Sequence, residues 1–326
     1  MSKLSTTYMG LKLKNPLVAA SSGLTGTVAR IRDLEDAGIA AVVLKSLFEE
    51  QIMQDVSQAD TDVYPEASDY LRTYVRQHSV EAHLALLRDA KKATSIPVIA
   101  SVNCASGHEW TDFALEFERV GADALELNIF LLPTERTVAS EVIEARYCDV
   151  VARVCGAVKI PVAVKIGFCF TNIAGFAARL AAAGARAVTL FNRFYEPDIN
   201  LDTLEMTASE VFSAPSESRR NLRLIGMVSA AVPELEIAAS TGIHDSAAVV
   251  KMLLAGARVA QLCSALYLHG PQTVGQILAD MEQFMARWNF TCIDDFRARL
   301  SYRNITAPEM YERTQFMRYY AGRNEQ

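Results

Sequence analysis

The sequence predicts an α/β fold, a TIM (β/α)8 barrel, because eight short apolar runs alternate with segments whose apolar residues have helical spacing. The runs are nearly continuous in apolar residues, as expected for parallel strands covered on both faces. A doubly wound open sheet is the structural alternative, but the G-x-G-x-x-G turn expected after its first strand is absent. The sequence therefore favours a closed barrel.

The expected strands and helices alternate from the start of the chain to residue 265. Strands are expected at 17–21, 41–46, 97–103, 124–129, 162–166, 187–192, 235–241 and 259–265. Helices are expected near 27–37, 79–93, 110–120, 139–155, 172–183, 217–230 and 245–255. Four helices end at a glycine followed by a small or apolar residue, which is typical of a C-cap leading into a strand: Gly38, Gly121, Gly184 and Gly256.

The rest of the chain predicts additional C-terminal helices, at about 273–289, 292–300 and 308–320, which would close the barrel and supply packing surface. No internal repeat or low-complexity tract divides the sequence. The Ser/Pro/Glu cluster at 213–218 is expected to be an active-site loop rather than a linker. We therefore expect a single domain over 1–326, with 273–326 as a C-terminal helical extension.

Composition excludes several classes of protein. The chain is 51% hydrophobic and 21% charged, which suits a large folded core and not disorder. Its net charge of −6 lacks the basic excess that nucleic-acid binding needs. No apolar stretch approaches the roughly 20 residues of a membrane span, and the first fifteen residues lack the apolar region of a secretory signal. We expect a cytoplasmic protein that binds neither membranes nor nucleic acid.

Cysteine and histidine patterns give no reason to expect a metal. The six cysteines are scattered without a C-x-x-C pair, and the five histidines form no H-E-x-x-H or H-x-H pattern. Free thiols in a reducing compartment are expected, and no metal ligands are assigned.

Polar residues close five of the expected strands. Lys45, Asn103, Asn128, Lys165 and Asn192 stand at the ends of strands two to six, and the carboxyl ends of the strands form the working face of a barrel. A single lysine at such a place could simply pair with a neighbouring carboxylate. Five ammonium or amide groups on one rim favour a ligand site.

A phosphate site is expected beside the seventh and eighth strands. The segment 239–245 runs from a strand through a glycine turn into a helix, and 261–265 closes the eighth strand. Backbone N–H groups and a helix N-terminus in these loops bind phosphate in many barrels. The alternative is an ordinary turn in which His244 or Asp245 caps the helix.

Together these segments resemble the class 1 dihydroorotate dehydrogenase family, TIM-barrel flavoproteins that carry FMN. The resemblance runs through most of the chain. It rests on Asn15-Pro16, Ala20-Ser21, Lys45-Ser46, Glu126-Leu127-Asn128, Val164-Lys165-Ile166, Asn192, Thr241-Gly242-Ile243 and Cys263-Ser264-Ala265-Leu266.

The resemblance implies an FMN-dependent oxidoreductase acting on CH–CH groups, which in the family oxidises dihydroorotate to orotate in pyrimidine biosynthesis by hydride transfer to flavin N5. Lys45 and Lys165 would be catalytic, because cationic charge near the isoalloxazine stabilises reduced flavin. The implied flavin-binding residues are Ala20, Ser21, Lys45, Ser46, Asn103, Asn128, Lys165, Asn192, Thr241, Gly242, Cys263 and Ser264, the last four holding the ribityl phosphate through their backbone.

The substrate half of the site departs from the family. Asn128 is followed by Ile-Phe-Leu-Leu-Pro, where the family has Leu/Ile-Ser-Cys-Pro-Asn, so Leu131 stands at the position of the general base and Pro133 replaces an asparagine. The Asn-x-x-Gly substrate loop has no counterpart at 64–70. Cys104 or Cys169 could supply a displaced base, so the base is unassigned and dihydroorotate is not established as the substrate.

Two other functions remain open. One is a lyase or aldolase that acts on a phosphorylated metabolite through a Schiff base on Lys165 or Lys45. The other is a flavin-binding protein without turnover. A small-molecule substrate is expected for the oxidoreductase. The absence of a cysteine cluster and of an apolar N-terminal extension favours a soluble electron acceptor. Family analogy and the surplus C-terminal helices favour a homodimer.

Overall fold

The computed structural model describes residues 3–48, 65–103, 109–193 and 196–312, and only the backbone of 65–78. Eight parallel strands form the predicted closed barrel. The pairing of its second strand with its third closes the ring. They are β3 (Leu17–Ala19), β4 (Ala41–Val43), β6 (Val98–Asn103), β7 (Ala124–Asn128), β8 (Val162–Ile166), β9 (Ala187–Leu190), β12 (Glu236–Ala239) and β13 (Val259–Leu262). A short strand, β5 (Leu47–Phe48), extends the sheet beside the carboxyl end of β6.

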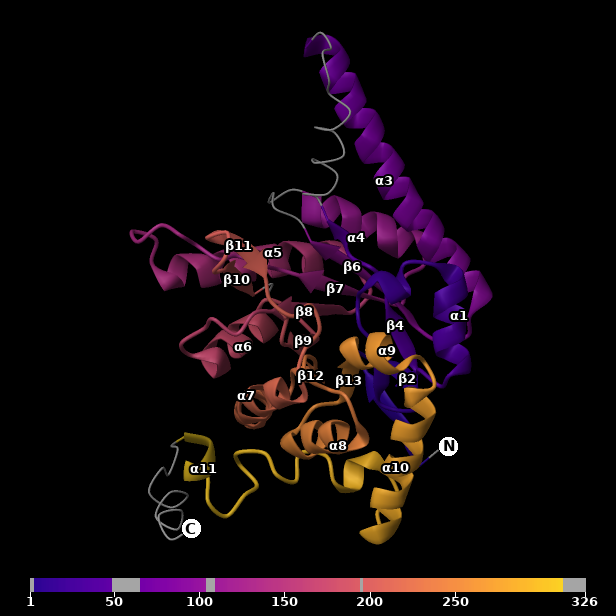
Figure 1. Cartoon of the computed structure of the whole chain (residues 1–326), viewed down its shortest axis with the longest axis vertical. Coiled ribbons are helices and arrows are strands. Elements are labelled where there is room, and N and C mark those ends of the chain that lie inside the picture. Colours follow the sequence, from indigo (N-terminus) through magenta and orange to yellow (C-terminus); the bar gives the residue numbers. More distant parts are fainter. Residues whose placement is uncertain (1–2, 49–64, 104–108, 194–195, 313–326) are drawn as a thin grey trace.

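Helices wrap the barrel in the predicted order (Figure 1). They are α1 (Val28–Asp36), α3 (Pro65–Ala93), α4 (Glu109–Val120), α5 (Ser140–Ala157), α6 (Ile173–Ala182), α7 (Ser218–Ala231) and α8 (Ser246–Ala255). The four predicted C-cap glycines have φ angles between +105° and +124°, which is why a residue without a Cβ ends each helix. The prediction placed the start of α3 too late, since the helix begins at Pro65, a residue that suits a first helical turn.

An N-terminal hairpin that the sequence pattern did not reveal plugs the amino end of the barrel. Its strands are β1 (Thr6–Tyr8) and β2 (Leu11–Leu13). Tyr8, Met9 and Leu13 are buried against the small alanine and valine side chains at the starts of the barrel strands. The barrel is therefore closed at this end and accessible at the other.

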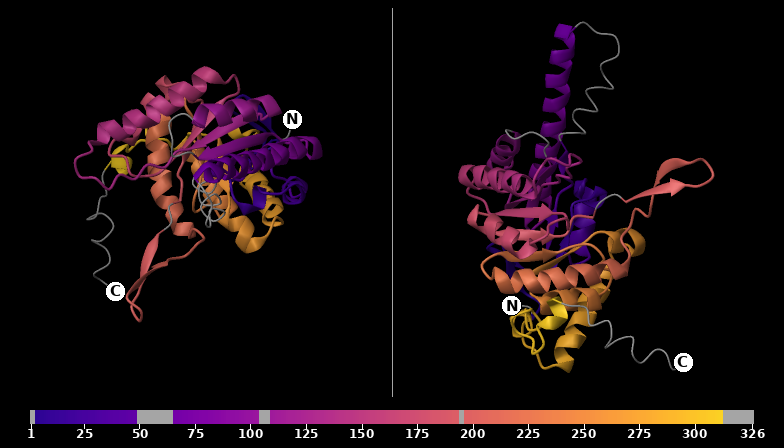
Figure 2. Two further views of the ribbon diagram at one scale, coloured as in Figure 1. Left: turned by 90° about the horizontal axis from the view of Figure 1, so that it is seen from above. Right: turned by 90° about the vertical axis from the view of Figure 1, so that its left-hand side faces the viewer.

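A second unpredicted hairpin joins β9 to α7. Its strands, β10 (Pro197–Asn200) and β11 (Glu205–Ala208), pair antiparallel with Ile199 opposite Met206, and every residue in both strands is exposed. This arm, residues 196–212, projects away from the barrel (Figure 2).

The C-terminal extension differs in part from expectation. It follows α9 (Ser264–His269) and contains α10 (Thr273–Arg287), a 3-10 turn (Ile293–Asp295) and α11 (Glu309–Glu312). The predicted helix at 292–300 is wrong, because the N–H groups of Ala298 and Leu300 donate to the carbonyls of Leu253 and Leu254 at the end of α8 and Ala298 has φ +60°. Strand β13 also ends before 263–265, where α9 begins. The prediction at 313–320 lies outside the described residues.

The expectation that the extension closes the barrel is wrong, because pairing between the barrel strands closes it. Helix α10 packs on the outside against α8 and α9. In the described part of the chain, no helix is both long enough and apolar enough to cross a membrane.

Candidate active site

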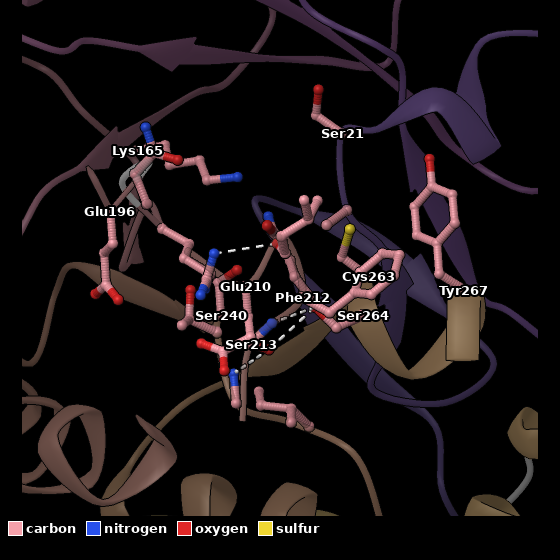
Figure 3. A pocket seen from close by; sticks show the side chains of 18 of the residues that line it. Ser21, Lys165, Glu196, Glu210, Phe212, Ser213, Ser240, Cys263, Ser264 and Tyr267 are labelled. Carbon is pink, nitrogen blue, oxygen red and sulfur yellow. Dashed lines mark hydrogen bonds between the residues drawn. The ribbon is translucent and has the colours of Figure 1, made fainter. Parts of the chain in front are cut away.

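A cavity of about 520 Å3 opens at the carboxyl ends of the barrel strands (Figure 3). Residues at or after the ends of β3, β8, β9, β12 and β13 line it, because parallel strands bring these ends to one face. Eight of the twelve predicted flavin-binding residues are among them: Ala20, Ser21, Lys165, Asn192, Thr241, Gly242, Cys263 and Ser264. The predicted flavin-binding residues therefore converge for the most part on one site, although only Lys165 and Asn192 of the five strand-end residues line it.

Two further predicted residues lie behind the cavity wall. Asn192 donates a hydrogen bond from Nδ2 to Oδ1 of Asn128 at 3.0 Å. The Ser46 N–H donates to Oγ of Ser21 at 3.0 Å, and the Ser46 hydroxyl lies 2.7 Å from Oγ of Ser101. Asn128 and Ser46 therefore orient cavity residues and do not line the cavity themselves.

The structure does not bring Lys45 or Asn103 to this cavity. Lys45 follows β4 by two residues and is exposed, and Asn103 is half-buried at the end of β6. Of the two cysteines considered as displaced bases, Cys169 is exposed and Cys104 lies outside the described residues. Lys165 is thus the predicted catalytic lysine that reaches the cavity.

Lys165 is not a rim residue, as its strand-end position suggested, but a buried one with 7% of its surface exposed. Its Nζ lies 4.0 Å from Oε1 of Glu126, which is itself 1% exposed in the barrel interior. Register pairing of β7 with β8 places Lys165 beside Asn128. The floor of the cavity therefore holds a cation with a buried carboxylate beneath it.

The hydroxyl groups of Ser213 and Ser264 and the Gly242 turn form the opposite side of the cavity. The Gly242 N–H donates to Oγ of Ser213 at 3.2 Å, and the Ser213 N–H donates to Oγ of Ser264 at 3.0 Å. The Ser213 hydroxyl is also 3.2 Å from Nε2 of His244, whose pKa is lowered by burial. The sequence pattern predicts the 213–218 loop at the site but does not distinguish Ser213 within it.

Gly242 cannot be replaced here without strain. Its φ is +76°, and an added Cβ would lie 2.4 Å from the backbone nitrogen of Ser218. Asp245 caps α8, as the alternative interpretation of this segment predicted. Its carboxylate accepts a 2.7 Å hydrogen bond from the Ala248 N–H. The turn and a capped helix coexist.

The arm supplies the outer wall of the cavity, which sequence analysis missed. The lining residues from this region are Arg193, Glu196, Ser209, Glu210, Val211 and Phe212. Nη1 of Arg193 donates to the Val211 carbonyl at 3.1 Å, which ties the base of the arm to the end of β9. The only sequence signal was the position of Arg193 directly after Asn192.

The segment at the family's base position is apolar and fixed. The Leu131 N–H donates to the Tyr147 hydroxyl at 3.0 Å, and that hydroxyl donates to the Ile129 carbonyl at 3.3 Å. Burial raises the pKa of Tyr147. A second cavity of about 100 Å3 borders this segment, lined in part by Leu131, Pro133 and Cys169. Leu131 offers no proton acceptor.

No three His, Cys, Asp or Glu side chains in the described ranges are grouped so that they could hold a metal ion.

A closed parallel barrel with a cavity at the carboxyl ends of its strands is the arrangement of a TIM-barrel enzyme. Residues 3–285 match the family model for dihydroorotate dehydrogenase, and the chain belongs to that family. The resemblance predicted from the sequence is therefore confirmed.

Curated relatives support the same family. The chain is 28% identical over 309 residues to the catalytic subunit of dihydroorotate dehydrogenase B (NAD(+)) of Thermoplasma volcanium, covering 90% of this chain and 97% of the relative. It is 26% identical over 304 residues to dihydroorotate dehydrogenase A (fumarate) of Limosilactobacillus reuteri, covering 90% and 96%. These relatives indicate an oxidoreductase.

Proposed function

We propose that this protein is an FMN-dependent oxidoreductase that takes a hydride from its substrate onto flavin N5. The observation that carries the proposal is the convergence of eight predicted flavin residues on one cavity with Lys165 at its floor. A bound FMN would supply the two-electron acceptor. The protein would bind and orient it.

The cavity suits the flavin in two ways. The Gly242 turn has no room for a side chain, and together with the Ser213 and Ser264 hydroxyls it would hold the phosphate. The Gln261 Oε1 atom at the cavity floor is buried and has no hydrogen-bond partner among the described residues, so it can accept a bond from a ligand N–H. Lys165 would place its positive charge beside the ring.

The FMN proposal is tested by the spectrum of the purified protein. We expect a yellow protein with about one FMN per chain, released by heat as FMN and not FAD. Absorption spectroscopy and chromatography of the released cofactor measure both. A colourless protein that takes up no added FMN would contradict the proposal, and a lysine trapped by borohydride with a phosphorylated substrate would favour the Schiff-base aldolase through Lys165.

We also propose a small-molecule substrate and a soluble electron acceptor in the cytoplasm. The described cysteines, Cys148, Cys155, Cys169, Cys263 and Cys292, are all free thiols, which gives no support for an iron–sulfur cluster. A place in pyrimidine biosynthesis follows only if dihydroorotate is the substrate. Leu131 and Pro133 favour a different one.

A homodimer is proposed on the evidence of the arm. Ile199 and Met206 share one face of the hairpin, with Leu201 and Leu204 at its tip, and these four side chains are 54%, 69%, 82% and 81% exposed. A two-stranded hairpin alone is marginally stable in water, and an exposed apolar face of this kind marks an interaction surface. A second copy would cover it.

Ile199→Asp should convert the dimer to a monomer, because a buried interface does not accept an unpaired carboxylate. Asn200→Asp, the adjacent residue on the opposite face of the strand, is the matched control and should leave the dimer intact. Light scattering coupled to size-exclusion chromatography measures the mass. A monomeric parent, or equal masses for the parent and both variants, would contradict the dimer through this surface.

A further inference from the structure

A polar layer crosses the barrel interior at and below the cavity floor. It consists of Glu126 on β7, Thr189 on β9 and Gln261 on β13, which are 1%, 0% and 2% exposed. Barrel interiors are usually filled by branched apolar side chains, so a carboxylate at this depth is unusual. A buried charge is costly unless it is paired.

Hydrogen bonds fix the direction of this carboxylate. Oε2 of Glu126 accepts from Oγ1 of Thr189 at 2.9 Å and from Nε2 of Gln261 at 2.7 Å. Oε1 accepts no hydrogen bond from any described residue, and Nζ of Lys165 lies 4.0 Å away. Two neutral donors thus hold one oxygen while the other faces the lysine.

The charge of Glu126 also acts on a buried phenol. Tyr8, from the N-terminal hairpin, is 1% exposed, and burial together with the Glu126 charge raises its pKa. Among the described residues, Lys165 is the cation that forms an ion pair with Glu126. The two groups therefore form a buried pair with its positive end at the cavity.

We propose that Glu126 is a positioning residue that acts through Lys165, as the counter-charge that limits how strongly this lysine attracts negative charge on a bound flavin. This inference rests on the proposed flavin function. Removing the Glu126 charge leaves the Lys165 ammonium uncompensated in a poorly solvated place, where charge interactions are stronger than in water. A negatively charged flavin state then binds this site more tightly.

Sulfite measures this effect by a spectroscopic change that needs no substrate. Its sulfur lone pair forms a bond to flavin N5, and the ring takes up the electron pair and one negative charge. In Glu126→Gln the side-chain oxygen can still accept from Thr189 and Gln261, so the shape and these hydrogen bonds are kept. We expect the sulfite Kd to fall about tenfold or more, and to rise about tenfold in Lys165→Gln.

Controls separate charge from disruption of the fold. Glu236→Gln neutralises a carboxylate at the start of β12, the opposite end of the barrel, and should change the Kd less than about twofold. In the Lys165→Gln background, adding Glu126→Gln should change the Kd less than about threefold, because the lysine through which Glu126 acts is gone. If Glu126→Gln does not fold, Glu126→Asp withdraws the carboxylate by one methylene and should lower the Kd to an intermediate value.

A flavin-containing Glu126→Gln protein with an unchanged or higher sulfite Kd would overturn the inference, since a merely structural role weakens binding. A full tenfold effect that persists without Lys165 would also overturn it. If the parent protein binds no FMN, the proposed function itself is overturned. The absorption spectrum shows this before any sulfite titration is made.

Discussion

Lys165→Gln is expected to slow flavin reduction by about 10²-fold or more at matched flavin occupancy. A preorganised charged donor aimed at developing negative charge is worth about 10²–10³-fold in other enzymes. Lys165 lines the cavity and is 7% exposed, so water replaces its charge poorly. Stopped-flow absorbance measures the rate of flavin reduction. The reductant is whichever of dihydroorotate, NADH or dithionite reduces the flavin of the parent protein fastest.

A lysine on the rim of the barrel, where its strand-end position places Lys165, would contribute little to stability. The structure changes that expectation, because Lys165→Ala would leave Glu126 as an uncompensated buried charge. We expect a loss of roughly 3–5 kcal/mol in the free energy of unfolding, and Lys165→Gln is the better variant because it preserves side-chain length.

Two other lysines give the comparison. Lys251→Ala on the outer surface of α8 is the matched control and should reduce flavin at the parent rate. Lys45→Ala tests the second predicted lysine, which is exposed and outside the cavity, and should have a smaller effect than Lys165→Gln. Equal flavin reduction in the parent and Lys165→Gln would remove Lys165 from the site.

Dihydroorotate is expected to reduce the flavin slowly or not at all at neutral pH. General-base catalysis is typically worth about 10²–10⁴-fold, and the family's base position holds Leu131, which cannot accept a proton. Its N–H is fixed by Tyr147, so the segment is ordered around an apolar side chain. Stopped-flow mixing of oxidised protein with dihydroorotate measures the reductive step directly.

Leu131→Cys restores an ionisable group and should accelerate this step only if dihydroorotate still fits beside Pro133. Leu132→Cys is the matched control, since it places the same thiol one residue away on a side chain that is 58% exposed. Rapid bleaching of the flavin in the parent would show that another group serves as the base, with Cys169 and Cys104 the first to be substituted.

The sequence by itself determined the barrel and its family. Strand and helix periodicity are local properties, so all eight barrel strands were predicted, and β8 has the predicted bounds of 162–166. The prediction of a helix at 292–300 failed because the N–H groups of Ala298 and Leu300 bond to carbonyls at the end of α8, a tertiary contact that a local pattern does not show. The two hairpins were missed because their strands, unlike the equally short barrel strands, are not buried apolar runs: every residue of β10 and β11 is exposed, and β1 and β2 each bury only one residue.

Only the tertiary structure decided which strand-end residues share the cavity. Residues that end parallel strands must meet at one face, so the convergence itself was predictable. Lys45 and Lys165 could not be distinguished, because β4 ends two residues before Lys45 whereas Lys165 lies within β8. In the sequence, Glu126 is recognised only as the first residue of the Glu126-Leu127-Asn128 motif. Its pairing with Lys165, Thr189 and Gln261 joins three other strands, and only closure of the barrel brings those side chains into one layer.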